Sequence, residues 1–535
     1  MHTRNILPLA ISFLILISIS QNPSFTHASP AAIPAPVLKW AYGGCTSWCQ
    51  TGWYASPAVA DLDKDNKPEV LWGGYDLFAL NGENGTVQWT GPSGSRIWPS
   101  IAVADLTGNG TLEVIVGRSS DTLTVYDNDG NVLWVRNPFG NGEIRTLAVA
   151  DLEDDGLLEI IIGRASGGST NQVSVYEPDG TVRPGFPARH DGEDGFGWGM
   201  YNQNVTVGDV NGDGYAEIIA PTDTHYITGL DRNGFQLLAN DAVYINSDHN
   251  NNDITTWAEV GVHVQHAVDV KGYANCGVEH RPNFADVAPA IADMDGDGKR
   301  EIIVPGNVYN CGTSPYTSLY YVPWIFSFDR TRWSGSGFDW EVIPTPEPGS
   351  GPLSQDYNVI ENAEMTTVIA DLDNDGQMEI LLPSYDGRVH AWWLDKTQHG
   401  NWPYDVPGSG IRFASEPIVV DLDNDGHAEV IFTSWPEKSS NQVGQLHILD
   451  YLGNSLHAIN LPNSLGSPTW NGGLGAPTIA NIDADADYEL VLGTSHSGAV
   501  AYDLPGSADA RILWGTGRGS NQRTGLRPTL QKRSQ

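Results

Sequence analysis

Acidic residues at alternating positions mark residues 292–306 of this chain, which read ADMDGDGKREIIVPG. Calcium is a hard cation that takes six to eight oxygen ligands, so a compact loop rich in carboxylates predicts a calcium site. The glycine at the sixth loop position permits the sharp turn that such a loop needs. The candidate ligands here are Asp293, Asp295, Asp297, Glu301 and the backbone carbonyl of Lys299.

This loop differs from an EF-hand, in which a bidentate glutamate stands at position 12 and a helix follows. Position 12 is Val304, inside a run of β-branched residues that favours a strand. The sequence therefore predicts a metal loop that joins two β-strands.

The chain contains eight copies of this loop, with first positions at residues 61, 105, 151, 209, 293, 371, 421 and 481. Counted in the same way, the further candidate metal ligands are Asp61, Asp63, Asp65 and Glu69; Asp151, Glu153, Asp155 and Glu159; Asp209, Asn211, Asp213 and Glu217; Asp371, Asp373, Asp375 and Glu379; Asp421, Asp423, Asp425 and Glu429; and Asp483, Asp485 and Glu489.

The eight loops are unequal in charge and in turn residues. The loop at residue 105 has Thr107 and Asn109 in ligand positions, and the last loop begins with Asn481. Asn66 and Ala486 replace the glycine at position 6, and asparagine tolerates a left-handed backbone better than most residues. An alternative is that all eight are polar turns, because Asp and Gly favour turns. Repulsion between clustered carboxylates favours a neutralising cation, and we expect calcium as a structural cofactor.

The spacing of the loops gives a basic unit of about 45 residues, with insertions in the middle of the chain. Each unit reads as four short strands, with a hairpin such as residues 123–134 turning at Asn-Asp-Gly. This period predicts an all-β fold, a β-propeller of four-stranded blades. We expect eight blades, with seven as the alternative. Either residues 37–40 or residues 512–514 could supply the strand that closes the ring.

Composition and the N-terminus point to an exported protein. An apolar stretch at residues 6–19 follows Arg4, so residues 1–28 are predicted to be a signal peptide, in preference to a membrane anchor. Residues 29–526 are then one propeller with an inserted region at about 239–285, and residues 527–535 form a tail. The net charge of −37 argues against a nucleic-acid partner. Of the three possible pairings of Cys45, Cys49, Cys276 and Cys311, we favour Cys45–Cys49 and Cys276–Cys311 as disulfides on proximity.

The units resemble FG-GAP (VCBS-type) repeats, the calcium-bearing blades of the integrin α-chain propeller and of many secreted bacterial proteins. The shared motif is D-x-D-x-D-G-x-x-E followed by an apolar strand, and the resemblance covers about residues 37–526. The C-terminal stretch WGTGRGSNQRTG also resembles the ends of bacterial members. The resemblance implies a propeller and calcium, and it implies no particular activity, because members include adhesins, lectin-like proteins and one class of pectin lyase.

A ligand site is expected on the face opposite the acidic loops, where connections enter each first strand. Arginines lie among aromatic residues there, a combination that suits acidic or neutral sugars. The alternative is that these side chains fill the central channel and pair with neighbouring acids. The candidates are Arg96, Trp98, Arg145, Trp198, Tyr201, His280, Arg281 and Arg412.

No established catalytic motif is present in the sequence. The primary hypothesis is therefore an extracellular binding or adhesion module for a glycan or protein partner, monomeric and without a membrane span after signal cleavage. The alternative is a polysaccharide lyase acting on uronic-acid polymers, suggested by the Arg, Trp and His content of the insertions. His263 and His266 are further acid–base candidates for it.

Overall fold

The computed structural model describes residues 1, 33–43, 54–165, 172–187, 199–222, 226–244, 254–264, 281–309, 320–354, 365–466 and 469–527. The chain divides into two compact units, residues 1–32 and 33–535, and the fold below is that of the second unit. The predicted signal peptide beyond Met1 and all four cysteines lie outside the described residues.

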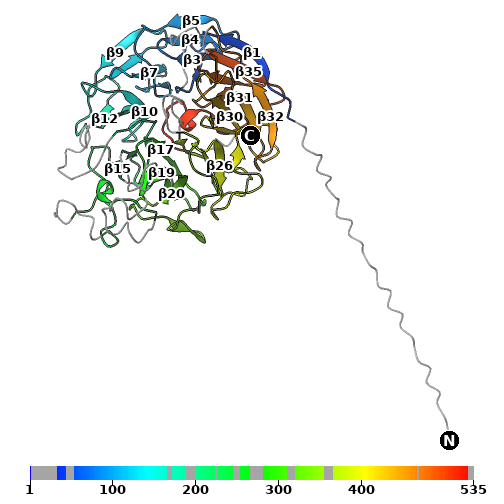
Figure 1. Cartoon of the computed structure of the whole chain (residues 1–535). Helices are drawn as coiled ribbons and strands as arrows, with labels where there is room; N and C mark the ends of the chain where they lie inside the picture. The colour runs from blue at the N-terminus through cyan, green and yellow to red at the C-terminus, as the bar shows by residue number, and fades with distance from the viewer. Residues whose placement is uncertain are drawn as a thin grey trace. The chain divides into compact units, whose positions relative to one another are not determined.

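The second unit is an all-β ring of eight antiparallel blades (Figure 1), so the predicted fold class is confirmed. Five blades have four strands: β2 (Ala58–Ala60), β3 (Glu69–Gly73), β4 (Leu77–Asn81) and β5 (Val87–Thr90) in blade 1; β6 (Ala102–Ala104), β7 (Glu113–Arg118), β8 (Thr122–Tyr126) and β9 (Val132–Arg136) in blade 2; β24 (Val368–Ala370), β25 (Glu379–Pro383), β26 (Arg388–Trp392) and β27 (Tyr404–Asp405) in blade 6; β29 (Ile418–Asp421), β30 (Glu429–Pro436), β31 (Gln445–Leu449) and β32 (Ser455–Asn460) in blade 7; and β33 (Thr478–Ala480), β34 (Tyr488–Gly493), β35 (Ala499–Leu504) and β1 (Val37–Tyr42) in blade 8.

Blades 3 to 5 have three full strands, and single β-bridges such as Tyr176 to Val182 stand where the outermost strand is expected. These strands are β10 (Ile144–Ala150), β11 (Glu159–Arg164) and β12 (Val173–Tyr176); β13 (Thr206–Gly208), β14 (Glu217–Pro221) and β15 (Ile227–Leu230); and β18 (Ala290–Ala292), β19 (Glu301–Tyr309) and β20 (Tyr320–Phe326).

Short elements decorate the ring. Two pairs stand apart: β17 (Val287–Ala288) runs parallel to β23 (Met365–Thr366), and β21 (Ser334–Gly335) pairs with β22 (Phe338–Asp339). Three more strands join existing sheets, namely β16 (Arg281–Asn283) on β19, β28 (Arg412–Ala414) on β30, and β36 (Arg511–Trp514) on β29. The described helices are the 3₁₀ turns η2 (Trp257–Glu259) and η3 (Gly517–Gly519). Neither has the length or apolarity to cross a membrane.

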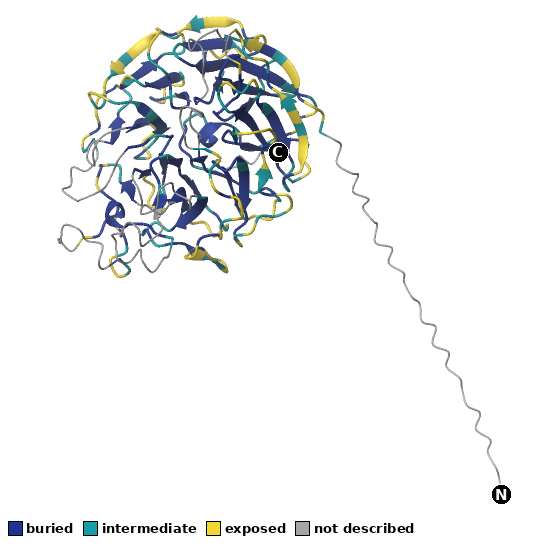
Figure 2. Ribbon diagram, viewed as in Figure 1, coloured by how far each residue is buried: buried dark blue, intermediate teal, exposed yellow. Residues whose placement is uncertain are grey.

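Burial follows strand order within each blade. Second strands such as β3 and β25 are buried along their whole length, whereas the outer strand β32 alternates between exposed and half-buried residues. Figure 2 shows this change from dark blue inner strands to yellow outer strands. Each blade therefore buries both faces of its inner strands against its neighbours and leaves only its outer strand in water.

The ring closes with the N-terminal strand. β1 pairs antiparallel with β35, with Tyr42 opposite Ala499, and so completes blade 8. The sequence contains two candidate segments for closing the ring. Residues 37–40 lie in β1 and close it, whereas residues 512–514 lie in β36 and pair with the innermost strand of blade 7. Closure therefore joins the first described strand of this unit to the last blade.

Indole groups connect successive blades. In five places a tryptophan Nε1–H near the outer edge of one blade donates to a backbone carbonyl in the outer hairpin of the next blade, at 2.7–3.0 Å. The pairs are Trp40 with Gly82, Trp134 with Pro178, Trp257 with Phe328, Trp340 with Leu394, and Trp402 with Tyr451. The high tryptophan content, 18 residues, thus has a partly structural use.

The axis of the ring is filled by the chain's own C-terminal end, residues 515–527, here called the axial segment. Figure 1 shows it in red at the middle of the ring. Backbone N–H groups of innermost strands donate to its carbonyls in five blades, through Val103, Val149, Val207, Ile291 and Ile479. All five stand two residues before position 1 of their acidic loops. The segment therefore satisfies strand edges that would otherwise face an open channel.

Two buried arginines hold the axial segment in place. Arg523 donates to the carbonyls of Pro57, Ile101 and Gly517 at 2.8–2.9 Å. Arg518 donates its backbone N–H to Glu416 Oε1 at 2.7 Å and its guanidinium to the Val205 carbonyl at 2.9 Å. Both arginines have φ of 61°, a left-handed conformation that L-residues seldom adopt and that surrounding contacts must maintain.

We expect removal of residues 515–535 to destabilise the folded protein by at least about 3 kcal/mol, since inner-strand N–H groups lose their partners and an apolar wall meets water. Chemical denaturation of the full-length and truncated proteins measures this difference. Removal of residues 528–535 alone is the matched control and should leave stability unchanged. Equal stability of the two truncated proteins would contradict the role assigned to the axial segment.

Candidate metal loops and an arginine–tryptophan cluster

Loops 1 to 8, one per blade, share a carboxylate clamp. In every loop the glutamate at position 9 accepts, through Oε2, a hydrogen bond from the backbone N–H of position 2 at 2.7–3.0 Å. Because position 9 begins the second strand and position 2 follows the first, this bond fixes the width of the turn.

The other acidic positions shape the turn. In all eight loops the side-chain oxygen at position 5 accepts the N–H of position 7 at 2.7–2.9 Å. In loops 1 to 7 the aspartate at position 1 accepts the N–H of position 6, and positions 4 and 6 have φ between 55° and 100°. Asn66 adopts this left-handed conformation in loop 1, as predicted.

The loops also connect neighbouring blades. The backbone carbonyl at position 2 accepts the N–H of position 8 in the next loop at four junctions, at 2.9–3.2 Å. The pairs are Leu158 with Leu106, Ala216 with Leu152, Met378 with Met294, and Ala428 with Leu372. The residue at position 2 is therefore held on both sides, by its own glutamate and by the adjoining blade.

The clamping glutamates are buried, with at most 6% of the residue exposed. Burial raises the pKa of all eight, and neighbouring loop carboxylates add to the shift in most of them. The pKa rises to about 9 for Glu379 and to about 8 for Glu301 and Glu429. A cation close to these carboxylates would offset the free-energy cost of ionising them in a buried site.

The donor set fits calcium in chemistry and spacing. Carboxylate triads with ligand atoms within 4.8 Å of one another occur in several loops, among them Asp61, Asp63 and Glu69; Asp293, Asp295 and Asp297; Asp371, Asp373 and Asp375; Asp421, Asp423 and Asp425; and Asp483, Asp485 and Glu489. In loop 6 two buried oxygens, Glu379 Oε1 and Asp373 Oδ1, have no hydrogen-bond partner among the described residues. Oxygen-only clusters of this kind suit a hard divalent cation, which the loop carboxylates and the position-7 carbonyl would hold.

Loops 2 and 4 depart from this set. Loop 2 keeps only Asp105 and Glu113 as carboxylates. In loop 4 the Asn211 amide donates to Asp213 and to Glu217, at 3.2 and 2.9 Å. In loops 3 and 8 the predicted ligands contact basic side chains of the chain itself, Arg183 and Lys39.

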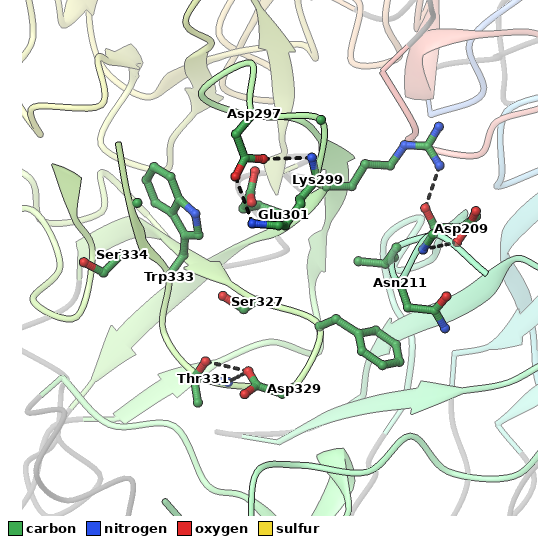
Figure 3. Close-up of a pocket in the computed structure, with 16 residues that line it drawn as sticks. Asp209, Asn211, Asp297, Lys299, Glu301, Ser327, Asp329, Thr331, Trp333 and Ser334 are labelled. Atoms are coloured by element: carbon green, nitrogen blue, oxygen red, sulfur yellow. Dashed lines mark hydrogen bonds and ion pairs between the residues drawn. The ribbon is translucent and has the colours of Figure 1, made fainter. Parts of the chain in front are cut away.

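A cleft of about 710 Å³ lies on the acidic-loop face, between blades 4 and 5. Figure 3 shows Asp209 and Asn211 of loop 4 on one side and Asp297 and Glu301 of loop 5 on another, with Trp333 beside them. Carboxylates outnumber the two cations of these walls, Lys299 and Arg300, so the cleft suits an anionic ligand poorly.

The opposite face has a different character, which comes from a cluster of Tyr54, Tyr75, Arg96, Trp98 and Arg145, here called the Trp98 cluster. The guanidinium carbons of Arg145 and Arg96 lie 4.0 and 4.6 Å from the centre of the half-buried Trp98 ring. Tyr54 packs edge-on against the same ring at 4.4 Å, and Arg96 Nη2 lies 3.3 Å from the Tyr75 hydroxyl. These residues come from three blades.

Arg145 keeps part of its guanidinium accessible. Its Nε donates to Glu143 Oε2 at 2.7 Å, and 22% of its side chain is exposed. Its two Nη groups have no hydrogen-bond partner in the described part of the chain. Tyr201 lies near enough for the Arg145 charge to act on it, although burial is the larger effect and raises the pKa of this phenol. Arg145 thus presents a planar pair of donors beside aromatic surface.

The remaining ligand candidates do not join this cluster. Arg412 donates to the carbonyls of Val406 and Gly410, at 2.7 and 3.0 Å, which is a local structural role. Trp198, His280 and His266 lie outside the described residues, and the backbone of Arg281 pairs with Tyr309 in β19. His263 is buried and its carbonyl accepts from Arg332.

A row of buried aromatic residues occupies the rest of this face. Successive ring contacts of 4.8–6.1 Å run through Tyr321, Tyr385, Phe413, Trp435, Trp470 and His496. Each of these side chains belongs to a residue that is at most 5% exposed. These rings therefore contribute packing in this part of the face.

An eight-bladed ring with an acidic loop in each blade places the chain among the β-propellers. The sequence model of the FG-GAP-like repeat matches residues 151–220 and 371–432, each match beginning at position 1 of a loop. The chain therefore contains FG-GAP-like repeats, and the predicted resemblance is confirmed.

Solved structures with a similar arrangement are distant in sequence. The biofilm matrix protein Bap1 of V. cholerae is 14% identical, with 92% of this chain and 96% of that chain covered and a TM-score of 0.49. The rhamnogalacturonan lyase YesW is 15% identical, with 87% and 75% covered and a TM-score of 0.46. The designed protein Ika8 is 11% identical, with 87% and 99% covered and a TM-score of 0.44. No curated protein sequence matches this chain significantly.

The raised glutamate pKa values predict an unusual pH dependence for the metal-free protein. Glu301, Glu379 and Glu429 keep a proton when folded and release it on unfolding between about pH 4.5 and 8 to 9. Their contribution to stability is present below pH 4.5 and is lost as pH rises through that window. Melting temperature in chelator should therefore fall between pH 5.5 and 9, and saturating calcium should reduce the fall. A chelator curve that rises over this range would contradict the assignment.

Proposed function

We propose that this protein is a secreted, calcium-braced β-propeller that binds an acidic glycan on the face opposite its acidic loops. The observation that supports the ligand class is the geometry of Arg145, which is held over Trp98 with both Nη groups available. A guanidinium can bind a carboxylate through two parallel hydrogen bonds, and a sugar ring can stack on nearby aromatic surface.

Charge distribution favours an anion at this face only. The chain carries a net charge of −37, and the acidic loops occupy the other end of every blade. A polyanion would be repelled by the loop face and attracted to the arginines of the Trp98 cluster. Uronic-acid polymers supply carboxylates and flat ring faces together, so we propose them as the ligand class.

Calcium is proposed as a structural cofactor of the loops. Each ion would neutralise buried carboxylates and hold the first and second strands of a blade at a fixed separation. Because this bracing acts on the loop face, it would stabilise the blades that carry the Trp98 cluster without touching the ligand. We further propose export through cleavage after residues 1–28, disulfides between Cys45 and Cys49 and between Cys276 and Cys311, and a monomeric state.

A polysaccharide lyase is the second proposal for the same face. Elimination from a uronate needs a cation on the carboxylate, a base for the α-proton and an acid for the leaving oxygen. Arg145 offers the cation, and the neighbouring Tyr201, a phenol whose pKa burial raises, offers the acid. Absorbance of unsaturated products during incubation with uronic-acid polymers separates the two proposals. Product formation that is lost in Y201F would identify a lyase, and binding without product supports the binding module.

Substitutions in the Trp98 cluster should weaken glycan binding. We expect R145M and W98A each to reduce affinity for polygalacturonate at least about tenfold, because each removes a direct ligand contact. R145K should not restore affinity, since lysine lacks the planar pair of donors. Calorimetric titration measures these affinities, with R412M as the control that retains binding. Unchanged affinity in both cluster variants would exclude this ligand site.

Calcium bracing can be tested at a single clamp. Glu379 is protonated at neutral pH in the metal-free protein, so E379Q preserves its hydrogen bond from Leu372 and should leave the melting temperature in chelator unchanged. The rise in melting temperature on adding calcium should be smaller in E379Q than in the wild type, because one ligand is lost. Differential scanning calorimetry measures both, with the exposed Glu83→Gln as control. A full calcium response in E379Q would contradict metal binding in loop 6.

A further inference from the structure

In two of the eight acidic loops a basic side chain of the chain itself reaches the carboxylates at positions 3 and 9. Lys39, on the closing strand β1, contacts Asp483 Oδ2 in loop 8 and places its Nζ 3.3 Å from Glu489 Oε1. Arg183 reaches loop 3, where its two Nη groups pair with both carboxylate oxygens of Glu153. Its Nη1 also lies 3.9 Å from Glu159 Oε1 and 3.1 Å from Glu177 Oε1.

Both cations contact the same two loop positions. Asp483 and Glu153 are the position-3 carboxylates, and Glu489 and Glu159 are the position-9 glutamates of their loops. A calcium ion in either loop would need these oxygens as ligands at 2.3–2.6 Å. Because the ammonium or guanidinium already lies within hydrogen-bonding or ion-pair distance of them, an added divalent cation would meet a like charge at close range.

The contacts are partly sheltered from water, which strengthens them, although 34% of the Glu153 side chain is exposed. Only 6% of the Arg183 side chain and 1% of the Glu159 side chain are exposed, and the Lys39 and Asp483 side chains are 18% and 11% exposed. Buried carboxylates need a cation, and here the cation is covalently part of the chain.

The other described loops lack this arrangement. Their ion pairs with lysine or arginine reach position 1 or position 5, as in Arg511 with Asp421 at 3.5 Å and the surface pair Lys299 with Asp297 at 3.2 Å. In loop 6 the position-9 oxygen Glu379 Oε1 has no hydrogen-bond partner among the described residues. The basic side chains of loops 3 and 8 are therefore features of those two blades.

Loop 8 also differs in backbone and in composition. It starts with Asn481, whose amide Nδ2 donates to the Asp485 carbonyl at 2.8 Å, where loops 1 to 7 have an aspartate that accepts. Ala484 and Ala486 occupy positions 4 and 6, and neither has the positive φ found there in loops 1 to 7. Loop 8 thus lacks both the position-1 carboxylate and the left-handed turn that would wrap a calcium ion in loops 1 to 7.

We infer that Arg183 and Lys39 replace calcium in loops 3 and 8, so that these two blades are held by internal ion pairs while other loops bind metal. This inference rests on the proposed calcium binding. It assigns Lys39 a second role, because Lys39 stands on the strand that closes the ring. Arg183 similarly joins blades 3 and 4, since its Nε donates to the Arg232 carbonyl at 2.7 Å. Ring closure and one further junction would then persist when calcium is withdrawn.

The test is calcium stoichiometry of chelator-treated protein, measured by equilibrium dialysis with calcium alone as the probe. Loop 3 has the usual left-handed residues, Asp154 and Gly156, so removing its internal cation should open a metal site. R183M is expected to bind one more calcium ion than the wild type. R136M is the matched control, because Arg136 donates to backbone carbonyls at the outer edge, and it should bind the wild-type number.

A second measurement covers the case in which R183M does not fold. Anomalous diffraction from calcium-soaked wild-type crystals should show ions in loops such as 5 and 6 and none in loops 3 and 8. An ion in loop 3 or loop 8 of the wild type, or equal stoichiometry of folded R183M and wild type, would overturn the inference. Absence of calcium from every loop would instead refute the proposed calcium bracing, so the two failures are distinguishable.

Discussion

The hydrogen bond from the position-2 N–H to a buried glutamate carboxylate is the interaction on which the other features of the loops depend. It is present in all eight blades, and it places one carboxylate where water cannot solvate it. The desolvated group must be protonated, or paired with a cation, to remain stable. The proposed calcium ions, the internal Lys39 and Arg183, and the raised pKa values are three responses to this one requirement.

The clamp also acts beyond its own blade. Because position 2 is fixed by its glutamate, its carbonyl points toward the next blade and accepts a hydrogen bond at four junctions. At the outer edge, indole N–H groups make an independent set of contacts between blades. Loosening of one acidic loop would therefore disturb a neighbouring blade on the loop side, while the outer contacts limit how far the disturbance spreads.

The filled axis restricts where a ligand can bind. The axial segment uses inner-strand N–H groups of five blades and buries two arginines, so the centre of the ring is packed protein. Recognition must then use one of the two end faces or the outer rim. The end faces carry opposite local charge, with carboxylates on the loop face and the Arg96 and Arg145 guanidinium groups on the other. This asymmetry is the reason an anionic ligand is proposed for one face only.

The repeated motif by itself determined the fold and the position of every acidic loop, because strand–loop–strand geometry is local and recurs with nearly every copy. It also predicted the left-handed Asn66, since few other residues tolerate that conformation. The closing strand, the axial segment and the cations of loops 3 and 8 were decided by tertiary structure alone. Lys39 and Asp483 are 444 residues apart, and Arg523 and Pro57 are 466 apart, so no local pattern could pair them. Ring closure brings such residues together, and only then does each buried charge acquire its partner.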